Sequence, residues 1–172
     1  MDITDTRSLP PAAAVTQLYA EHALGLVRLA VLLVGDRASA EDIVQDAFLG
    51  LYRRWDRLPD TSAPLAYVRA SVVNGCRTAL RRRSRARQVG NFAERPAESA
   101  EAVALLSEEQ RAVAGALRRL PERQREALVL RYYLDLSQAE IATVMGISRG
   151  TVKSATSRAL AAVGRTVRGE GS

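Results

Sequence analysis

Residues 137–160, "SQAEIATVMGISRGTVKSATSRAL", restrict the fold of this chain more than any other stretch. Ser137 followed by Glu140 is typical of a helix start, because each side chain can cap a free backbone N–H group of the other residue. Gly146 favours the end of that helix, and Ser148 favours the start of the next. The sequence therefore predicts a short helix, a tight glycine turn and a second helix.

The residues between these signals have the sizes that two crossing helices need. Small or apolar residues are expected inside, at Ala139, Ile141, Ala142, Val144, Val152, Ala155 and Ala159, with Ile147 at the corner. This is the helix-turn-helix arrangement, in which the second helix enters the major groove of DNA. Polar residues that can reach bases or phosphates are predicted on its outer face: Arg149, Thr151, Lys153, Ser154, Ser157 and Arg158. The alternative is an ordinary helical hairpin with a charged solvent face.

The rest of the chain also follows helical spacing, and no segment alternates convincingly with period two. We expect an all-α protein without strands. Further helices are predicted over residues 15–35, 39–55, 65–83, 101–120 and 121–135. Ser39 with Asp42 is expected to start the second of these, and Pro64 suits the first turn of the third. Gly75 is a weak point within that third helix.

Two small helical domains joined by a flexible linker are predicted from these patterns. The expected boundaries are a leader at 1–13, a first domain at 14–83, the linker at 84–100 and a second domain at 101–168. The linker loses the apolar period and contains Gly90 and Pro96. We see no secretory signal and no apolar run near the roughly 20 residues that span a bilayer, so no membrane partner is expected and we place the protein in the cytoplasm.

The net charge of +6 is unevenly distributed. Residues 1–60 hold nine acids and six arginines, residues 61–90 hold seven arginines and no acid, and residues 137–172 hold five bases and two acids. Two basic segments separated by neutral sequence suggest two contacts with a polyanion. The alternative is a solvated, arginine-rich surface in a chain of biased composition.

The sequence does not favour an enzyme, a metal site or a cofactor. His22 and Cys76 are the only histidine and cysteine, and both lie within apolar helical runs where packing is the simpler explanation. No glycine-rich phosphate loop is present. The acids at 41–46 have no histidine or second carboxylate cluster beside them that would complete a metal site.

Residues 140–160 resemble the DNA-binding end of two families, the LuxR-type regulators and region 4 of bacterial sigma factors. The first half of the chain decides between them. "AEDIVQDAFLGLYRRW" and "PLAYVRASVVNGCRTALRRR" resemble sigma region 2, whereas a LuxR-type response regulator would begin with alternating strands and helices. Regions 2 and 4 joined directly are typical of the extracytoplasmic-function (ECF, group IV) sigma factors. The sequence of residues 34–55 is similar to the actinobacterial SigE-type subfamily. A stand-alone LuxR-like regulator remains the alternative.

The resemblance implies binding to core RNA polymerase, at the β′ clamp helices and the β flap, and to promoter DNA at the −35 and −10 elements. By position, Asp42, Gln45 and Asp46 match the residues that dock on the clamp helices. They lie at i, i+3 and i+4, on one helical face. The alternative is that Glu41 and Asp42 only complement the helix dipole, which explains Asp46, one turn further on, poorly.

The resemblance also implies a pocket for an unstacked −10 base, to which Asp60, Thr61 and Ser62 match, with Trp55 and Tyr67 able to stack or pack nearby. Trp55 fits a core position better. Contacts along the melted strand are assigned to Arg69, Asn74, Arg77, Arg81, Arg82 and Arg83. This helix has fewer aromatic residues than common relatives. The six outward residues of 149–158 are assigned to the −35 element, and an anti-sigma factor is a further implied partner.

Overall fold

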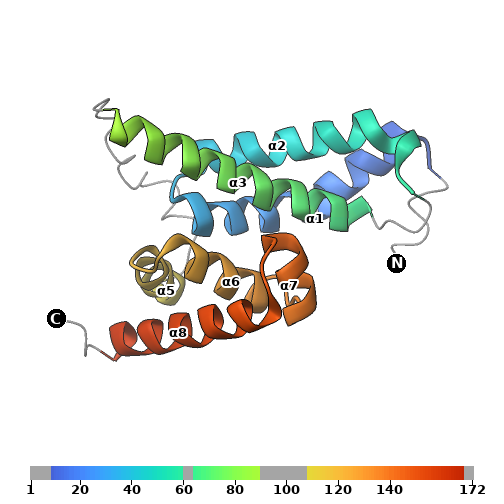
Figure 1. Ribbon diagram of the computed structural model, residues 1–172. Helices are drawn as coiled ribbons and strands as arrows, with labels where there is room; N and C mark the ends of the chain where they lie inside the picture. The colour runs from blue at the N-terminus through green and yellow to red at the C-terminus, as the bar shows by residue number, and fades with distance from the viewer. Residues whose placement is uncertain (1–8, 60–63, 90–107, 169–172) are drawn as a thin grey trace. The chain divides into compact units, whose positions relative to one another are not determined.

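The structure is a computed structural model that describes residues 9–59, 64–89 and 108–168. Its helices are α1 (Pro11–Val34), α2 (Arg37–Arg54), a short 3₁₀ helix η2 (Trp55–Arg57), α3 (Pro64–Gln88), α5 (Glu108–Arg118), α6 (Glu122–Tyr132), α7 (Gln138–Met145) and α8 (Arg149–Val167) (Figure 1). The described residues contain no strand, so the all-α prediction is confirmed. The chain divides into two compact units, Met1–Ala97 and Glu98–Ser172.

Unit 1 is built from three long helices, α1, α2 and α3, each packed against the other two (Figure 1). Its core is aliphatic: Leu29, Leu51, Val68 and Val72 have at most a trace of exposure. One aromatic contact joins α1 to α2, where the rings of Tyr19 and Phe48 meet edge to face at 5.0 Å. A bundle of this kind buries one stripe of each helix and leaves the opposite stripes for binding.

Helix α1 corrects one expectation. By length and composition alone it could cross a membrane, although no run of that kind was expected from the sequence. Leu18, Leu26, Leu29 and Leu33 are buried inside unit 1, as in a core helix that is apolar on most faces. The helix begins at Pro11, within the predicted leader, and ends at Val34, followed by the C-cap Gly35 with φ +87°. Proline suits a first helical turn, and glycine tolerates the left-handed backbone at a helix end.

The start of α2 was predicted at Ser39, and this prediction is wrong. The helix begins at Arg37, and its N-cap is Asp36, whose side chain accepts a hydrogen bond from the Ser39 backbone N–H at 2.8 Å. Asp36 has the extended backbone that an N-cap residue needs. Ser39 and Asp42 therefore lie inside the helix, and their spacing is not a capping pair.

Helix α3 begins at Pro64, as predicted, but continues to Gln88 instead of ending at Arg83. Residues 84–88 of the predicted linker are thus helical, and residues 90–100 of it fall outside the described residues. Gly75 of α3 packs directly against Ile43 of α2. A Cβ atom at this position would lie 2.7 Å from Ile43 Cγ2, too close for two carbon atoms. The glycine permits the close approach of the two helices.

Unit 2 contains α5, α6, α7 and α8, with α8 packed against the other three. Leu130 of α6, Ile141 of α7 and Val152 of α8 are completely buried. Pro121 stands immediately before α6 and Ser137 caps α7, as predicted. The core of this unit is aliphatic too. The helix predicted over 121–135 ends earlier, at Tyr132, and Asp135 has a left-handed backbone with φ +52°.

Candidate nucleic-acid and partner-binding surfaces

The α7–α8 helix-turn-helix is fixed by hydrogen bonds at three places: the start of α7, the end of α7 and the start of α8. The Ser137 hydroxyl accepts from the Glu140 N–H at 3.2 Å, and the Glu140 carboxylate accepts from the Ser137 N–H at 2.7 Å. Gly146 has φ +64°, and the N–H groups of Gly146 and Ile147 bond back to Thr143 and Ala142. This pattern is the Schellman motif, which ends a helix sharply.

Ser148 then starts α8, because its hydroxyl accepts from the Thr151 N–H at 3.1 Å. The predicted capping box, turn glycine and second cap are all confirmed. The hydrogen bonds from the Ser137 backbone and side chain outweigh a small opposing effect of desolvation and hold the pKa of Glu140 below its ordinary value. The Glu140 carboxylate therefore stays ionised, and the box stays closed, throughout the neutral range.

The outer face of α8 has the composition that duplex recognition needs. Val152 and Ala159 are buried and Ala155 is half-buried, as predicted for the inner face. All six residues predicted to face outward are exposed: Arg149, Thr151, Lys153, Ser154, Ser157 and Arg158. The Thr151 hydroxyl lies 2.9 Å from that of Ser148 and so shares its hydrogen-bonding capacity with the cap. The other five side chains project from the first three turns of the helix.

Helix α3 presents a second basic face. Asn74 and Arg81 are exposed, whereas Arg69 and Arg77 are half-buried. Arg77 donates to the Asn74 side chain at 3.4 Å, so these two predicted contacts are brought together within one helical turn. Arg82 is exposed too, and so is Arg85, which the sequence analysis did not assign to DNA. Its position one turn after Arg81 could have identified it, had the helix been extended past residue 83.

The predicted base pocket at Asp60, Thr61 and Ser62 lies outside the described residues. Of the two aromatic residues expected beside it, Trp55 belongs to η2 and Tyr67 to the first turn of α3, and both are half-buried. The two side chains thus flank the segment that joins α2 to α3 on either side in the sequence. Each has an exposed part that could contact a ligand.

Helix α2 carries a third surface, with a different character. Asp42, Gln45 and Asp46 are exposed and share one helical face. Leu49 and Tyr52 continue this face and are 50% and 51% exposed, which is high for large apolar side chains. The sequence analysis assigned neither Leu49 nor Tyr52 to a binding surface. The spacing 42, 45, 46, 49, 52 could have identified the stripe. An acidic and apolar stripe of this kind suits a protein partner better than DNA.

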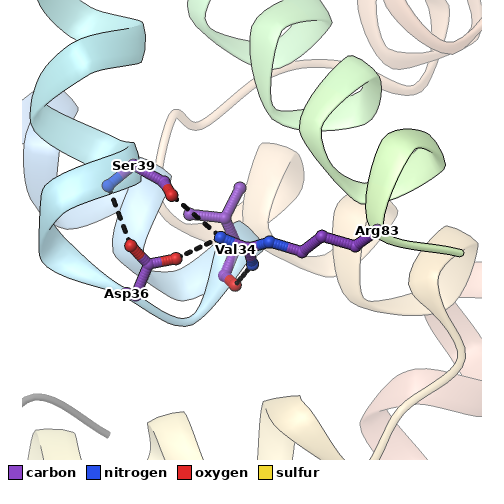
Figure 2. Close-up of polar contacts among 4 residues, drawn as sticks. All are labelled: Val34, Asp36, Ser39 and Arg83. Carbon is purple, nitrogen blue, oxygen red and sulfur yellow. Dashed lines mark hydrogen bonds and ion pairs between the residues drawn. The ribbon is translucent and has the colours of Figure 1, made fainter. Parts of the chain in front are cut away.

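Arg83, which the sequence analysis assigned to the melted strand, bonds within unit 1 to the turn between α1 and α2. It donates hydrogen bonds to the Val34 carbonyl at 2.7 Å and the Ser39 hydroxyl at 2.8 Å, and it forms an ion pair with Asp36 (Figure 2). Burial alone would raise the pKa of the Asp36 carboxyl. The hydrogen bonds from Ser39 and the charge and hydrogen bond of Arg83 outweigh that effect and hold the pKa below its ordinary value.

The single histidine and the single cysteine of the chain both lie in unit 1. His22 is half-buried beside Glu21 on α1, and Cys76 is buried in the core of unit 1. Within residues 9–59, 64–89 and 108–168, no three His, Cys, Asp or Glu side chains lie close enough together to hold a metal ion. The surfaces that stand out are the faces of α2, α3 and α8.

These features define a class of protein: an all-α DNA-binding protein that places a helix-turn-helix in one unit and a basic helix in another. Comparison with known families gives the same division. Residues 18–86 match the model "Sigma-70 region 2", and residues 110–163 match "Sigma-70, region 4". A region-2 domain has no place in a LuxR-type regulator, so the alternative reading of the helix-turn-helix is rejected.

Curated relatives agree over most of the chain. The ECF RNA polymerase sigma factor SigL of Mycobacterium tuberculosis is 34% identical over 146 residues, which are 83% of this chain and 82% of that protein. The RNA polymerase sigma-E factor of Streptomyces coelicolor is 36% identical over 137 residues, covering 79% and 76% of the two chains. The chain belongs to the ECF RNA polymerase sigma factors, proteins that direct core RNA polymerase to promoter DNA.

Two solved structures are similar. The sigma factor RpoE from Bartonella quintana, in complex with the anti-sigma factor NepR, aligns with a TM-score of 0.66 and 25% identity over 89% of this chain and 95% of that one. CnrH, in complex with the cytosolic domain of CnrY, aligns with a TM-score of 0.67 over 97% and 95% of the two chains. At 24% identity the second likeness concerns the fold alone.

Proposed function

We propose that the three exposed faces of this sigma factor divide its tasks. The α2 face binds core RNA polymerase, the basic face of α3 holds the melted −10 strand, and the outer face of α8 recognises the −35 element. Asp42, Gln45 and Asp46 serve the first task, and Arg69, Asn74, Arg77 and Arg81 serve the second. Arg149, Thr151, Lys153, Ser154, Ser157 and Arg158 serve the third.

The α2 stripe carries this proposal. Its two carboxylates, Asp42 and Asp46, would repel DNA phosphates, so the stripe is of no use to a protein that acts on DNA alone. Leu49 and Tyr52 offer apolar area beside the charges. A partner with basic and apolar residues on one surface would neutralise the acids and bury the apolar groups together. The β′ clamp helices are the partner that the family resemblance implies.

The test measures binding and transcription separately. Wild type, Asp46→Ala and Leu49→Ala are titrated against labelled core enzyme, and each reconstituted holoenzyme is assayed for run-off transcription at saturating core. We expect each substitution to raise the Kd for core on the order of tenfold, or about 1.4 kcal/mol. Transcription should recover when core is in excess, because the DNA-binding faces are unchanged.

Glu21→Ala is the matched control, since Glu21 is an exposed acid of the same unit on another helix. Its Kd for core should equal that of the wild type. Equal affinities for core among all four proteins would contradict the assignment of the α2 face. A tight, specific duplex footprint without core, and no transcript with it, would contradict the division of tasks as a whole.

The assignment of DNA to α3 and α8 is supported by their charge. Arg81, Arg82 and Arg85 are exposed on α3, and Arg149, Lys153 and Arg158 are exposed on α8. Basic residues in two separate units match a promoter with two separated elements. For the −10 base pocket, Asp60, Thr61 and Ser62 stay a proposal from the family resemblance.

We further propose an anti-sigma partner, cytoplasmic location and no catalytic activity of the protein's own. The similar structure from Bartonella quintana, which contains an anti-sigma factor, supports the first point. A partner that covers the α2 stripe would keep core polymerase away. Affinity capture of the tagged protein from its native cell under several stresses tests this. Recovery of polymerase and no small partner in every condition would argue against an anti-sigma factor.

A further inference from the structure

In the "RRR" run at 81–83, Arg81 and Arg82 are exposed, whereas Arg83 hydrogen-bonds across the helical bundle of unit 1. It lies near the C-terminal end of α3, yet its guanidinium reaches the turn between α1 and α2, nearly fifty residues away in the sequence (Figure 2). One nitrogen, Nη1, donates to the Val34 carbonyl at 2.7 Å. The other, Nη2, donates to the Ser39 hydroxyl at 2.8 Å and to the Asp36 carboxylate.

Each partner of Arg83 lies at or beside a helix end. Val34 is the last residue of α1, Asp36 is the N-cap of α2, and Ser39 is in the first turn of α2. The carbonyl groups at a helix C-terminus have no partner within the helix and favour a cation. The Asp36 carboxylate is only 10% exposed and needs a counter-charge. One planar guanidinium supplies both, and a lysine ammonium could not bond these acceptors with the same geometry.

The neighbours of Arg83 have a different environment. Arg81, Arg82 and Arg85 are exposed, whereas the side chain of Arg83 is 23% exposed and directed into the bundle. The exposed three are free to approach phosphates only where α3 itself is held in place. Asp42, the first residue of the α2 stripe, comes six residues after Asp36, or about 9 Å along the helix. The contact between Arg83 and Asp36 therefore joins α3 to α2 close to both proposed binding faces.

We propose that Arg83 is a positioning residue of unit 1: it fixes the basic end of α3 against the start of α2 and does not itself contact DNA. This inference rests on the proposed function, in which α2 binds polymerase and α3 binds the −10 strand. Arg83 then sets how accurately the basic face of α3 meets the strand once α2 has docked. Its removal should impair DNA opening more than it impairs binding to core.

The experiment compares Arg83→Gln with Arg81→Gln in the full chain, each reconstituted with core. Promoter affinity is measured over a range of salt concentrations, and opening is measured by a fluorescent base analogue in the −10 element at saturating holoenzyme. A lost contact to single-strand phosphate lowers the slope of log K against log salt by about 0.7. We expect that change for Arg81→Gln alone. For Arg83→Gln we expect an unchanged slope, a Kd for core within about twofold, and opening slowed on the order of tenfold.

Two further variants guard against simple misfolding. Arg83→Lys keeps the charge, so a phosphate contact would survive it, whereas the positioning role would not. Asp36→Asn removes the counter-charge with little change of shape. It should slow opening as Arg83→Gln does, and the double variant should be no slower than either single one. All five variants, the double one included, are assayed at a temperature where circular dichroism finds them folded.

A salt slope lowered equally by Arg83→Gln and Arg81→Gln would overturn the inference, and so would opening at the wild-type rate in folded Arg83→Gln. A wild-type holoenzyme that starts no transcript at all would overturn the proposed function and this inference with it. Failure of the proposed function is thereby distinguished from failure of this inference alone, because the wild-type result is obtained before any variant is compared.

Discussion

Replacing Gly75 by alanine tests whether the approach of α3 to α2 is as close as the structure describes. The new methyl group would lie 2.7 Å from Ile43 Cγ2, with Cγ1 at 3.6 Å and Cβ at 3.7 Å. The nearest atom is a methyl group on a β-branched carbon, which rotates little because χ1 of isoleucine is stiff. Either the two helices must separate or Ile43 must leave its rotamer.

Two opposing effects set the magnitude. Overpacking a well-packed core costs about 1–3 kcal/mol. Alanine in a helix interior is about 1 kcal/mol more favourable than glycine. We therefore expect Gly75→Ala to destabilise unit 1 by about 0–2 kcal/mol. Gly25 is the matched control: it lies inside α1 of the same unit, and a Cβ there would have no heavy atom within 4 Å. Gly25→Ala should stabilise the unit by about 1 kcal/mol.

The free energy of unfolding is measured by urea titration with tryptophan fluorescence. Trp55 is the only tryptophan of the chain and belongs to unit 1, so its signal reports that unit. The two variants should differ by about 1–3 kcal/mol, the overpacking cost alone. In the Gly75→Ala background, Ile43→Leu removes the branch at Cβ and should recover most of the loss. Equal stability of the two alanine variants would refute the reasoning, because the collision would then not exist.

Three more outcomes follow from individual side chains. Ser148→Ala removes the N-cap of α8 and should cost about 1 kcal/mol in thermal unfolding of unit 2, while Ser157→Ala, on the exposed face, should change little; equal losses would speak against the cap. Lys153→Ala should weaken transcription from a promoter with a −35 element and lower the salt slope by about 0.9, and an unchanged slope would remove Lys153 from the DNA-binding set. Because the pKa of Asp36 is lowered on folding, its contribution to stability is present above its ordinary value and lost as pH falls through the folded one. Asp36→Asn should flatten the fall in the urea midpoint below about pH 4, and a fall as steep as in the wild type would exclude that role.

The α7–α8 unit could be predicted from the sequence because its determinants are local. Ser137 and Glu140 are three residues apart, and Gly146 and Ser148 act on the backbone beside them. The backbone conformation at each of these four residues is favoured by the residue type itself. The inner and outer faces of α8 follow from the same helical period. The exposed positions of the predicted −35 set therefore agree with the structure, while their contacts with DNA stay a prediction.

The features that escaped prediction depend on residues distant in sequence. Asp36 is a common type of N-cap residue, but its burial is compensated by Arg83 from another helix, and no residue near position 36 in the sequence indicates that partner. Ser39 and Asp42 matched a capping pattern by chance of spacing. Tyr52 fits a helical apolar pattern, but its face is turned outward by the packing of Leu51 and Phe48. From the sequence, Gly75 is a residue that weakens α3. The structure shows that it leaves room for Ile43 of α2, a residue distant in sequence.

The same distance in sequence limits what the charge of a segment can say about binding. Residues 61–90 hold seven arginines, which as single-strand phosphate contacts would give a salt slope of about 5. Arg83 is held by Asp36, and Arg69 and Arg77 are half-buried. Among the described side chains, Arg81, Arg82 and Arg85 are exposed and account for a slope of about 2, and the half-buried Arg69 and Arg77 add at most about 1.4. The basic run thus contains arginines that are proposed to bind the strand and one arginine, Arg83, that holds α3 in place. The sequence of the run does not distinguish the two roles; the position of Asp36 beside Arg83 in the structure does.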